Sequence, residues 1–333
     1  MKSLRSVVAI AGVLGVVILA VWAGALVNRA ESPTLISTWG TLGTHPGEFT
    51  QPFDVAVDAE GFVYVTDSGN QRVQKFSPDG VFLLQWGKKG NGPGEFIKPT
   101  GIAIGRDGTV YVSDYFADTI QRFTREGRFL GQWGHSDGEP GAFDSPSGVA
   151  VDHQGNVYAV DEYRFRIQKF TGDGGFLTTW GKKGKVSVMR SVLNGLVPED
   201  QDGEFYYPAH LAVGPDQNIY VADSYNNRVQ VFTPEGRFLR KWGGMGLWGG
   251  RFRVVSDLAF DNAGLIYVAD FYNNRIQIFS LQGDYLGQWG ASGSEPGRFD
   301  GPTGLAISQA GDIYVADFHN SRIQRFRLRE HRT

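Results

Sequence analysis

The 333-residue sequence contains no cysteine. This absence excludes a disulfide scaffold, a cysteine-ligated metal and a thiol nucleophile. The sequence also lacks a marked excess of charge of either sign, because its formal net charge is only −3. Such a balance does not indicate a nucleic-acid partner. Sustained helical periodicity is missing after residue 30, except for an approximate apolar stripe within residues 186–200.

Glycine and apolar residues are plentiful. The chain has 46 glycines, about twice ordinary usage, which predicts many tight turns. Hydrophobic residues make up 41% of the chain and aromatic residues 13%. This composition can bury a core and excludes a disordered chain. All-β folds of this length often form one domain.

The first thirty residues differ from the rest. Residues 7–27 carry no charge and follow Lys2 and Arg5. The run is long enough to cross a bilayer as a helix, and the preceding positive charges would orient the following chain outside the cytoplasm. The Ala-Gly-Ala sequence at 23–25 leaves a cleaved signal peptide as the alternative, with a buried soluble helix as a third interpretation.

We therefore predict one N-terminal hydrophobic helix within residues 1–30, acting as a membrane anchor or a signal peptide. Residues 31–333 would then be anchored to the membrane facing outside the cytoplasm, or secreted. The membrane contact in this interpretation is made by residues 7–27.

A 47-residue repeat organises the remainder of the chain. Three residue series recur with the same spacings of 47, 47, 47, 62 and 47 residues. They are the Trp-Gly pairs (Trp39, Trp86, Trp133, Trp180, Trp242, Trp289), an aspartate after an apolar segment (Asp67, Asp114, Asp161, Asp223, Asp270, Asp317) and a phenylalanine (Phe49, Phe96, Phe143, Phe205, Phe252, Phe299). Three agreeing series define six units and one 15-residue insertion, at about 186–200 between units three and four.

Each unit contains four short segments with strand composition, which in the first unit are 54–58, 62–66, 72–76 and 81–86. Six four-stranded units predict an all-β fold, a six-bladed β-propeller, because sheets arranged around an axis cover one another. The last unit has no Trp-Gly strand, whereas residues 35–40 precede the first unit. We therefore predict that the N-terminal strand completes the last blade and closes the ring.

The sequence Tyr-Val-x-Asp, followed by Asn-x-Arg-(Ile/Val)-Gln-x-Phe, resembles the NHL repeat, best in residues 220–232, 267–279 and 314–326. The resemblance extends over about 35–328 and implies a six-bladed propeller. NHL propellers include protein-binding and RNA-binding modules, extracellular sensor domains and a zinc-dependent lyase. Since one fold hosts several activities, function has to be inferred from sites.

The lyase activity is not expected here. The zinc ligands of that enzyme resemble a Pro-His pair at the innermost strand. In this chain the residue after the aligned proline position is never histidine, and the six residues are Phe53, Thr100, Ser147, Ala209, Ser256 and Thr303.

Most repeated polar residues are interpreted as architecture. An arginine follows the repeated aspartate by five residues in every unit except the second, which has Thr119. The two side chains bracket a turn, so we expect a charge-assisted hydrogen bond that holds it. Function is expected where the units differ.

The units differ where the innermost strand begins, near the central channel. The aligned residues are Asp54, Gly101, Gly148, His210, Asp257 and Gly304. Asp54 and His210 belong to opposite blades, and Asp257 lies one blade from His210. These three residues are candidate ligands for a substrate at the channel mouth or for a divalent cation. The alternative is a hydrated channel lining, and no cofactor is otherwise indicated.

Aromatic residues gather in the loops between the second and third strands. They are Tyr115, Phe116, Tyr163, Phe165, Tyr225, Phe271, Tyr272, Phe318 and His319. Either these side chains form a partner-binding face, or they fold back between blades. The insertion lies on the same face and would cap apolar surface, cover the channel mouth or meet a partner.

The sequence therefore predicts an extracytoplasmic binding module for a protein or a small extracellular ligand, rather than for nucleic acid. The alternative is a metal-dependent lyase or hydrolase acting at the central channel.

Overall fold

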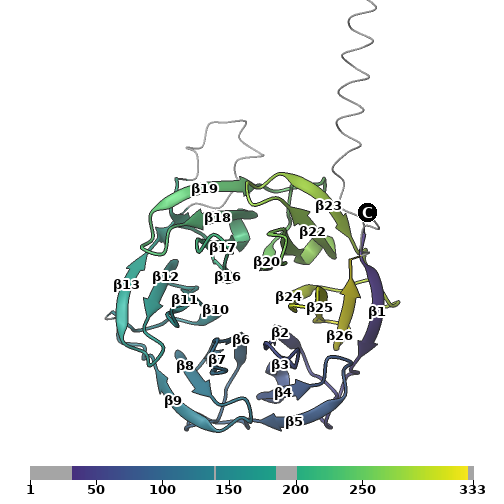
Figure 1. The fold of residues 1–333 in the computed structure, drawn as a ribbon. Coiled ribbons are helices and arrows are strands. Elements are labelled where there is room, and N and C mark those ends of the chain that lie inside the picture. The colour runs from purple at the N-terminus through teal and green to yellow at the C-terminus, as the bar shows by residue number, and fades with distance from the viewer. Residues whose placement is uncertain (1–31, 139, 185–200, 329–333) are drawn as a thin grey trace, which may run out of the picture.

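The computed structural model describes residues 32–138, 140–184 and 201–328, which form six four-stranded antiparallel sheets around a central axis (Figure 1). Blade 1 contains β2 (Pro52–Val57), β3 (Val63–Asp67), β4 (Arg72–Phe76) and β5 (Phe82–Trp86). Blade 2 contains β6 (Pro99–Ile104), β7 (Val110–Asp114), β8 (Thr119–Phe123) and β9 (Phe129–Trp133). Blade 3 contains β10 (Pro146–Val151), β11 (Val157–Asp161), β12 (Arg166–Phe170) and β13 (Phe176–Trp180).

The second half of the ring repeats this plan. Blade 4 contains β16 (His210–Val213), β17 (Ile219–Asp223), β18 (Arg228–Phe232) and β19 (Phe238–Gly243). Blade 5 contains β20 (Val255–Phe260), β21 (Ile266–Asp270), β22 (Arg275–Phe279) and β23 (Tyr285–Trp289). Blade 6 contains β24 (Pro302–Ile307), β25 (Asp312–Asp317), β26 (Arg322–Arg327) and, as its outermost strand, β1 (Thr34–Trp39).

The pairing of β1 with β26 confirms the predicted closure. The two strands are antiparallel, with Leu35 opposite Phe326 and Trp39 opposite Ile323. Segments nearly 300 residues apart therefore share one sheet, and blade 6 has no missing strand (Figure 1). Closing the ring also removes the open edge at which another chain could pair.

The predicted fold class requires one correction, which concerns the hydrophobic helix expected before the propeller. Residues 32–138, 140–184 and 201–328 contain no α-helix, only the 3-10 turns η1 (Ser68–Asn70), η2 (Ser224–Asn226) and η3 (Phe271–Asn273). Throughout this part of the chain the apolar residues fall into short strand segments rather than helical stripes. Residues 7–27, to which the helix was assigned, lie outside the described residues. The described ranges are therefore all-β, without an α-helix.

Within the described ranges, no helix is both long enough and apolar enough to span a bilayer. The predicted apolar stripe of the insertion, residues 186–200, lies outside the described residues. Its flanks are described: β14 (Lys182–Lys183) pairs in parallel with β15 (Glu204–Phe205). Four of the other connections between blades contain the same contact as a single bridge, for example Leu42 with Phe49. The insertion thus extends a connection whose base is the same as in other blades.

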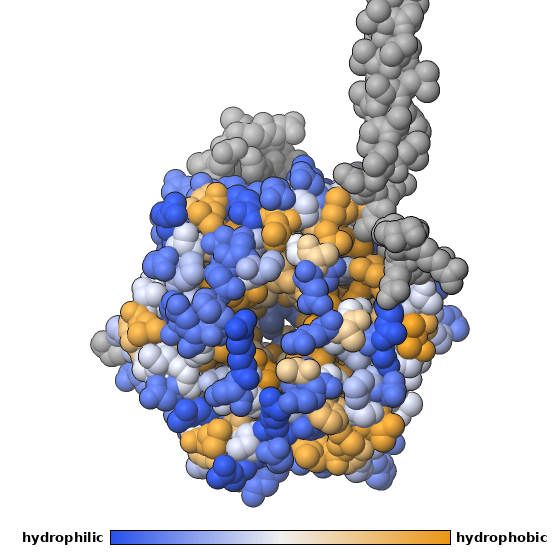
Figure 2. Space-filling view, viewed as in Figure 1, coloured by the Kyte–Doolittle hydropathy of each residue, from blue (hydrophilic) through white to orange (hydrophobic). Residues whose placement is uncertain are grey.

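Two faces of the ring are distinguished below. The loop face carries the connections between blades and those between the second and third strands of each blade. The turn face carries the tight turns, such as Ser77–Gly80. Because the innermost strands begin at the loop face, Asp54 and its aligned residues lie near that end of the channel. The space-filling view shows one face of the ring with a hollow at its centre (Figure 2).

The hydrophobic core is divided among the six blade interfaces. Each of the six clusters of buried apolar residues joins two adjacent blades. At the closing interface the Trp39 ring lies 6.0 Å from the ring of Tyr314 in its own blade and 6.0 Å from that of Phe76 in blade 1. Gly80, with φ +84°, lies against the indole, where a Cβ would be 2.5 Å from the Trp39 ring. The tryptophan series therefore packs adjacent blades together.

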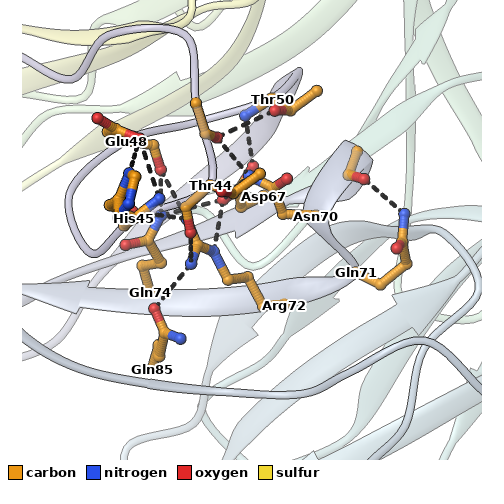
Figure 3. A network of polar contacts seen from close by, with 12 residues as sticks. Thr44, His45, Glu48, Thr50, Asp67, Asn70, Gln71, Arg72, Gln74 and Gln85 are labelled. Carbon is orange, nitrogen blue, oxygen red and sulfur yellow. Dashed lines mark hydrogen bonds and ion pairs between the residues drawn. The ribbon is translucent and has the colours of Figure 1, made fainter.

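The repeated aspartate and arginine form the expected ion pair in five blades, with nitrogen–oxygen distances of 2.7 to 2.8 Å. In blade 1, Asp67 accepts hydrogen bonds from Arg72 Nε and from Gln74 Nε2 (Figure 3). Arg72 also donates to the carbonyl oxygens of Thr44 and Glu48 in the preceding connection. In the five blades that have the arginine, the network thus fixes the preceding connection on the loop face to the blade.

We predict that Trp39→Ala lowers the free energy of unfolding by about 3 kcal/mol, because it empties space between the first and last blades. Trp248→Ala is the matched control, since Trp248 is 81% exposed and should change stability by no more than about 0.5 kcal/mol. Urea unfolding followed by circular dichroism measures both. Equal stability of the two variants would contradict the closing role of Trp39.

Candidate binding site at the channel and its mouth

The three channel residues predicted from the sequence meet in the structure. His210 Nε2 lies 3.0 Å from Asp54 Oδ2, and His210 Nδ1 lies 2.6 Å from Asp257 Oδ1. The imidazole therefore bridges carboxylates from blades 1 and 5. It crosses the channel to reach blade 1, as the opposite positions of the two blades require. The three side chains are 12%, 2% and 1% exposed for His210, Asp54 and Asp257.

Each carboxylate is held by backbone donors from its own strand and from the next blade. Asp54 accepts hydrogen bonds from the backbone N–H groups of Val55, at 2.7 Å, and Ile102, at 2.8 Å. Asp257 accepts from Leu258 and Leu305, both at 2.6 Å. Because β-strand geometry supplies these donors at fixed positions, the two carboxylates are oriented before any ligand arrives.

Glycines at the aligned positions make room for this arrangement. A Cβ on Gly148 would lie 2.5 Å from His210 Cα, and one on Gly304 would lie 2.6 Å from Asp54 Cα. A side chain at either position would therefore collide with the histidine or the aspartate. The presence of glycine at the other hub positions follows from the close approach of the innermost strands.

The electrostatics of the bridge favour a charged imidazole. Burial opposes the charge, but Asp257 and Asp54 outweigh it and raise the pKa of His210 well above its usual value. Burial also raises the pKa of Asp257, against the opposing effect of His210. Since the pKa of His210 in the folded protein exceeds that of the unfolded chain, the titration of His210 contributes stability that is fully present below about pH 6.5. This stabilisation is lost as the pH rises through the folded value.

The bridge also has the donor set of a metal site. One ligand atom from each of Asp54, His210 and Asp257 lies within 4.8 Å of the others. Two carboxylates and a neutral imidazole would balance the charge of a divalent cation, which would take the place of the imidazolium proton. The same three residues can therefore act as a protonated brace or as a cation site.

On the loop face, one residue in each blade directly follows the repeated aspartate at the end of the second strand. These residues are Ser68, Tyr115, Glu162, Ser224, Phe271 and Phe318. Glu162 is the only acid in this series. Tyr115 donates a hydrogen bond to Glu162 Oε1 at 3.2 Å, and Lys98 Nζ lies over the Tyr115 ring, 4.7 Å from its centroid. Burial raises the pKa of Glu162 to about 7, and burial lowers that of Lys98.

The aromatic residues predicted to form a partner-binding face all lie on the loop face, but their exposure differs. Phe116 is 60% exposed, Tyr272 54%, and Tyr163 and Tyr225 47% each. His319 is also exposed, whereas Tyr115, Phe271 and Phe318 are half-buried. Phe165 is buried in the core between blades 3 and 4. Phe165 therefore follows the alternative interpretation, in which the side chain folds back between blades.

Two tyrosines that the sequence analysis did not single out complete this aromatic surface. Tyr206 and Tyr207 contact each other with ring centroids 4.7 Å apart, and Tyr207 lies 5.2 Å from Tyr163 and 5.5 Å from Tyr225. Lys98 and Glu162 were missed as well. The signal for Glu162 was present, because comparing the residue after the aspartate across all units shows one acid among hydroxyl and aromatic side chains.

The comparisons with known proteins agree with the repeat and the ring. The NHL repeat matches residues 205–232, 252–279 and 299–326, and a six-bladed β-propeller family matches residues 56–169. The chain contains NHL repeats within a six-bladed β-propeller. Its three matched repeats belong to blades 4, 5 and 6, where the motif was best in the sequence.

Curated proteins and solved structures are also similar to this chain. The E3 ubiquitin-protein ligase TRIM71 of Xenopus tropicalis is 46% identical over 50 residues, which is 15% of this chain and 6% of that protein. The matched segment thus spans a small part of the length of that relative. A gluconolactonase from Xanthomonas campestris has a TM-score of 0.62 at 13% identity, covering 91% of this chain and 99% of its own.

Two further structures have the same fold. A protein of unknown function from Bacteroides thetaiotaomicron has a TM-score of 0.65 at 14% identity, covering 89% of this chain and 76% of its own. An inactive virginiamycin B lyase from Staphylococcus aureus has a TM-score of 0.57 at 12% identity, covering 90% and 99%. At these identities the likeness concerns the fold alone.

We predict that the His210 ring stays an imidazolium at pH 8, because two buried carboxylates face it. The ring ¹⁵N chemical shifts report the protonation state, and the His210→Gln spectrum assigns the signal by its loss. Asp257→Asn should lower the pKa of His210, since it removes one of the two charges. Neutral-imidazole shifts at pH 7 in the unmodified protein would contradict this account of the bridge.

Proposed function

We propose that this NHL propeller is a recognition module that binds a protein or a small ligand on its loop face, around the channel mouth. The supporting observation is where aromatic surface is exposed. Among the described residues, seven phenylalanine, tyrosine and tryptophan side chains are exposed, and five of them lie on the loop face: Phe116, Tyr163, Tyr225, Trp248 and Tyr272. Aromatic side chains are enriched at binding interfaces because they bury much area at low entropic cost.

The location of the module is part of the proposal. Residues 7–27 carry no charge and follow Lys2 and Arg5, which supports placement of the propeller outside the cytoplasm. Strand β1 begins at the turn face, since Thr34 pairs with Arg327 at the end of β26. The chain before Thr34 therefore joins the propeller on the side opposite the proposed binding face. A C-terminal reporter active only in the cytoplasm would contradict this placement.

Capture experiments test the binding face. We expect the purified chain to retain a partner from an extract of its own organism, and Tyr163→Ala combined with Tyr225→Ala to abolish the capture. Val81→Ser combined with Leu83→Ser is the matched control, because these exposed residues lie on the turn-face side and in the outer strand of blade 1. Loss of capture in the control, or its persistence in the loop-face variant, would contradict the proposal.

A second candidate function rests on the convergence of Asp54, His210 and Asp257. In this alternative the cluster holds a divalent cation and the propeller acts as a metal-dependent lyase or hydrolase. The chemistry supplied by the cation would be polarisation of a substrate oxygen or activation of a water.

Elemental analysis tests the second candidate. It predicts stoichiometric metal in the purified protein and its loss in His210→Ala. Asp216→Asn is a suitable control, because that acid lies in a turn on the opposite face and bonds Tyr220. A metal-free protein that still binds its partner would exclude the metal-dependent function.

A further inference from the structure

The mouth of the channel carries an acid beside a continuous arc of tyrosines. Glu162 comes from blade 3 and accepts a hydrogen bond from Tyr115 of blade 2. Tyr115 contacts Tyr163 with ring centroids 6.4 Å apart, and the arc continues through Tyr207 to Tyr225 of blade 4 at 5.2 and 5.5 Å. Four tyrosine rings from three blades thus follow one another beside a single carboxyl group.

The tyrosines and the acid share one electrostatic environment. Burial raises the pKa of Tyr225, and neighbouring groups that include Tyr272 and Glu162 raise it further. Burial also raises the pKa of Tyr207, and Tyr206, Tyr163 and Glu162 add to the effect. The negative charge of Glu162 therefore acts on two tyrosines farther along the arc, Tyr207 and Tyr225.

The local backbone explains how Tyr207 reaches this position. Tyr207 has φ +48°, and the residue at the same place before the innermost strand also has a positive φ in four other blades. Blade 6 places Gly301 there, with φ +68°. The fold thus imposes a left-handed conformation at this site, and blade 4 fills it with a tyrosine where glycine would be less strained.

An ammonium group of the chain itself already uses this surface. Lys98 Nζ lies 4.7 Å from the centroid of Tyr115 and 5.1 Å from that of Phe116. The electrostatic attraction of Glu162 acts on the same ammonium group. Aromatic faces attract cations through their quadrupoles, and a nearby carboxylate adds to the attraction. Lys98 occupies only the blade 2 end of the arc, so the part formed by Tyr163, Tyr207 and Tyr225 has ring surface beyond its reach.

We propose that this arc, together with Glu162, binds an organic cation of the alkylammonium class. The inference rests on the proposed function, because it names the chemistry that the loop face recognises. The groups that interact with Glu162 are the Tyr115 phenol, the Ser147 hydroxyl and the Lys98 ammonium, and its charge also acts on Tyr207 and Tyr225. Lys98 is the cation among these groups, and it is therefore the internal competitor of the ligand.

Calorimetric titration of the full-length protein with choline tests the proposal. The neutral analogue 3,3-dimethylbutan-1-ol has the same shape without the charge and should bind at least about tenfold more weakly, because the attraction is electrostatic. Glu162→Gln should weaken choline binding by about tenfold, and Tyr207→Leu should weaken it as well. Glu126→Gln, on the turn face, is the matched control and should leave the affinity unchanged.

Lys98→Met separates recognition from a structural role. Removing the internal ammonium should strengthen choline binding, whereas a variant that merely disturbed the fold would weaken it. Choline affinity should also rise between pH 6 and pH 8, since the pKa of Glu162 is about 7 and only the ionised carboxylate attracts the cation.

Any one of three results would overturn this proposal. These are equal affinity for choline and the neutral analogue, no choline binding, and unchanged choline affinity in Glu162→Gln. Each of these results leaves the proposed function standing if the Tyr163 and Tyr225 double variant still loses partner capture. Conversely, choline binding without any captured partner would uphold the cation site and contradict protein recognition.

Discussion

The pairing of β1 with β26 is the constraint on which the rest of the structure depends. It joins the two ends of the described chain in one sheet, so that all six blade interfaces can be packed and none is left open. The order of blades around the axis then becomes fixed. Opposite positions of blades 1 and 4 follow from this order, and without them His210 could not reach Asp54.

In the closed ring, the residues that recur from blade to blade hold the structure together. The residues that differ between blades indicate where function lies. The aspartate–arginine pairs and the tryptophans recur because every blade has the same loops to hold and the same interface to fill. At the hub and at the mouth, by contrast, blades contribute different side chains to shared positions. His210 meets two carboxylates there, and Glu162 meets an arc of tyrosines. A ring of identical blades could form neither arrangement.

Much of the fold and of the channel site could be predicted from the sequence, because the spacing of the repeated residues alone aligns the six units. The alignment predicted the closing strand and brought Asp54, His210 and Asp257 together correctly. It could not predict that Phe165 is buried, since this requires the left-handed backbone at that residue, with φ +56°, which turns the ring between blades. The sequence analysis missed Tyr207 for a related reason. Its position, shortly before the innermost strand, has the sequence of a connection between blades. The prediction of an N-terminal helix as part of the fold class was wrong, because the described residues form strands and turns.

The most direct test of the central claim is a disulfide across the closing pair. The chain has no cysteine, so Thr34→Cys with Arg327→Cys introduces a single possible bond between residues that lie opposite each other. The account predicts that mild oxidation of the folded protein forms this disulfide quantitatively by mass spectrometry. The out-of-register pair Ile36→Cys with Arg327→Cys should remain reduced. Reduced thiols in the first variant, or equal oxidation of both, would contradict closure by β1.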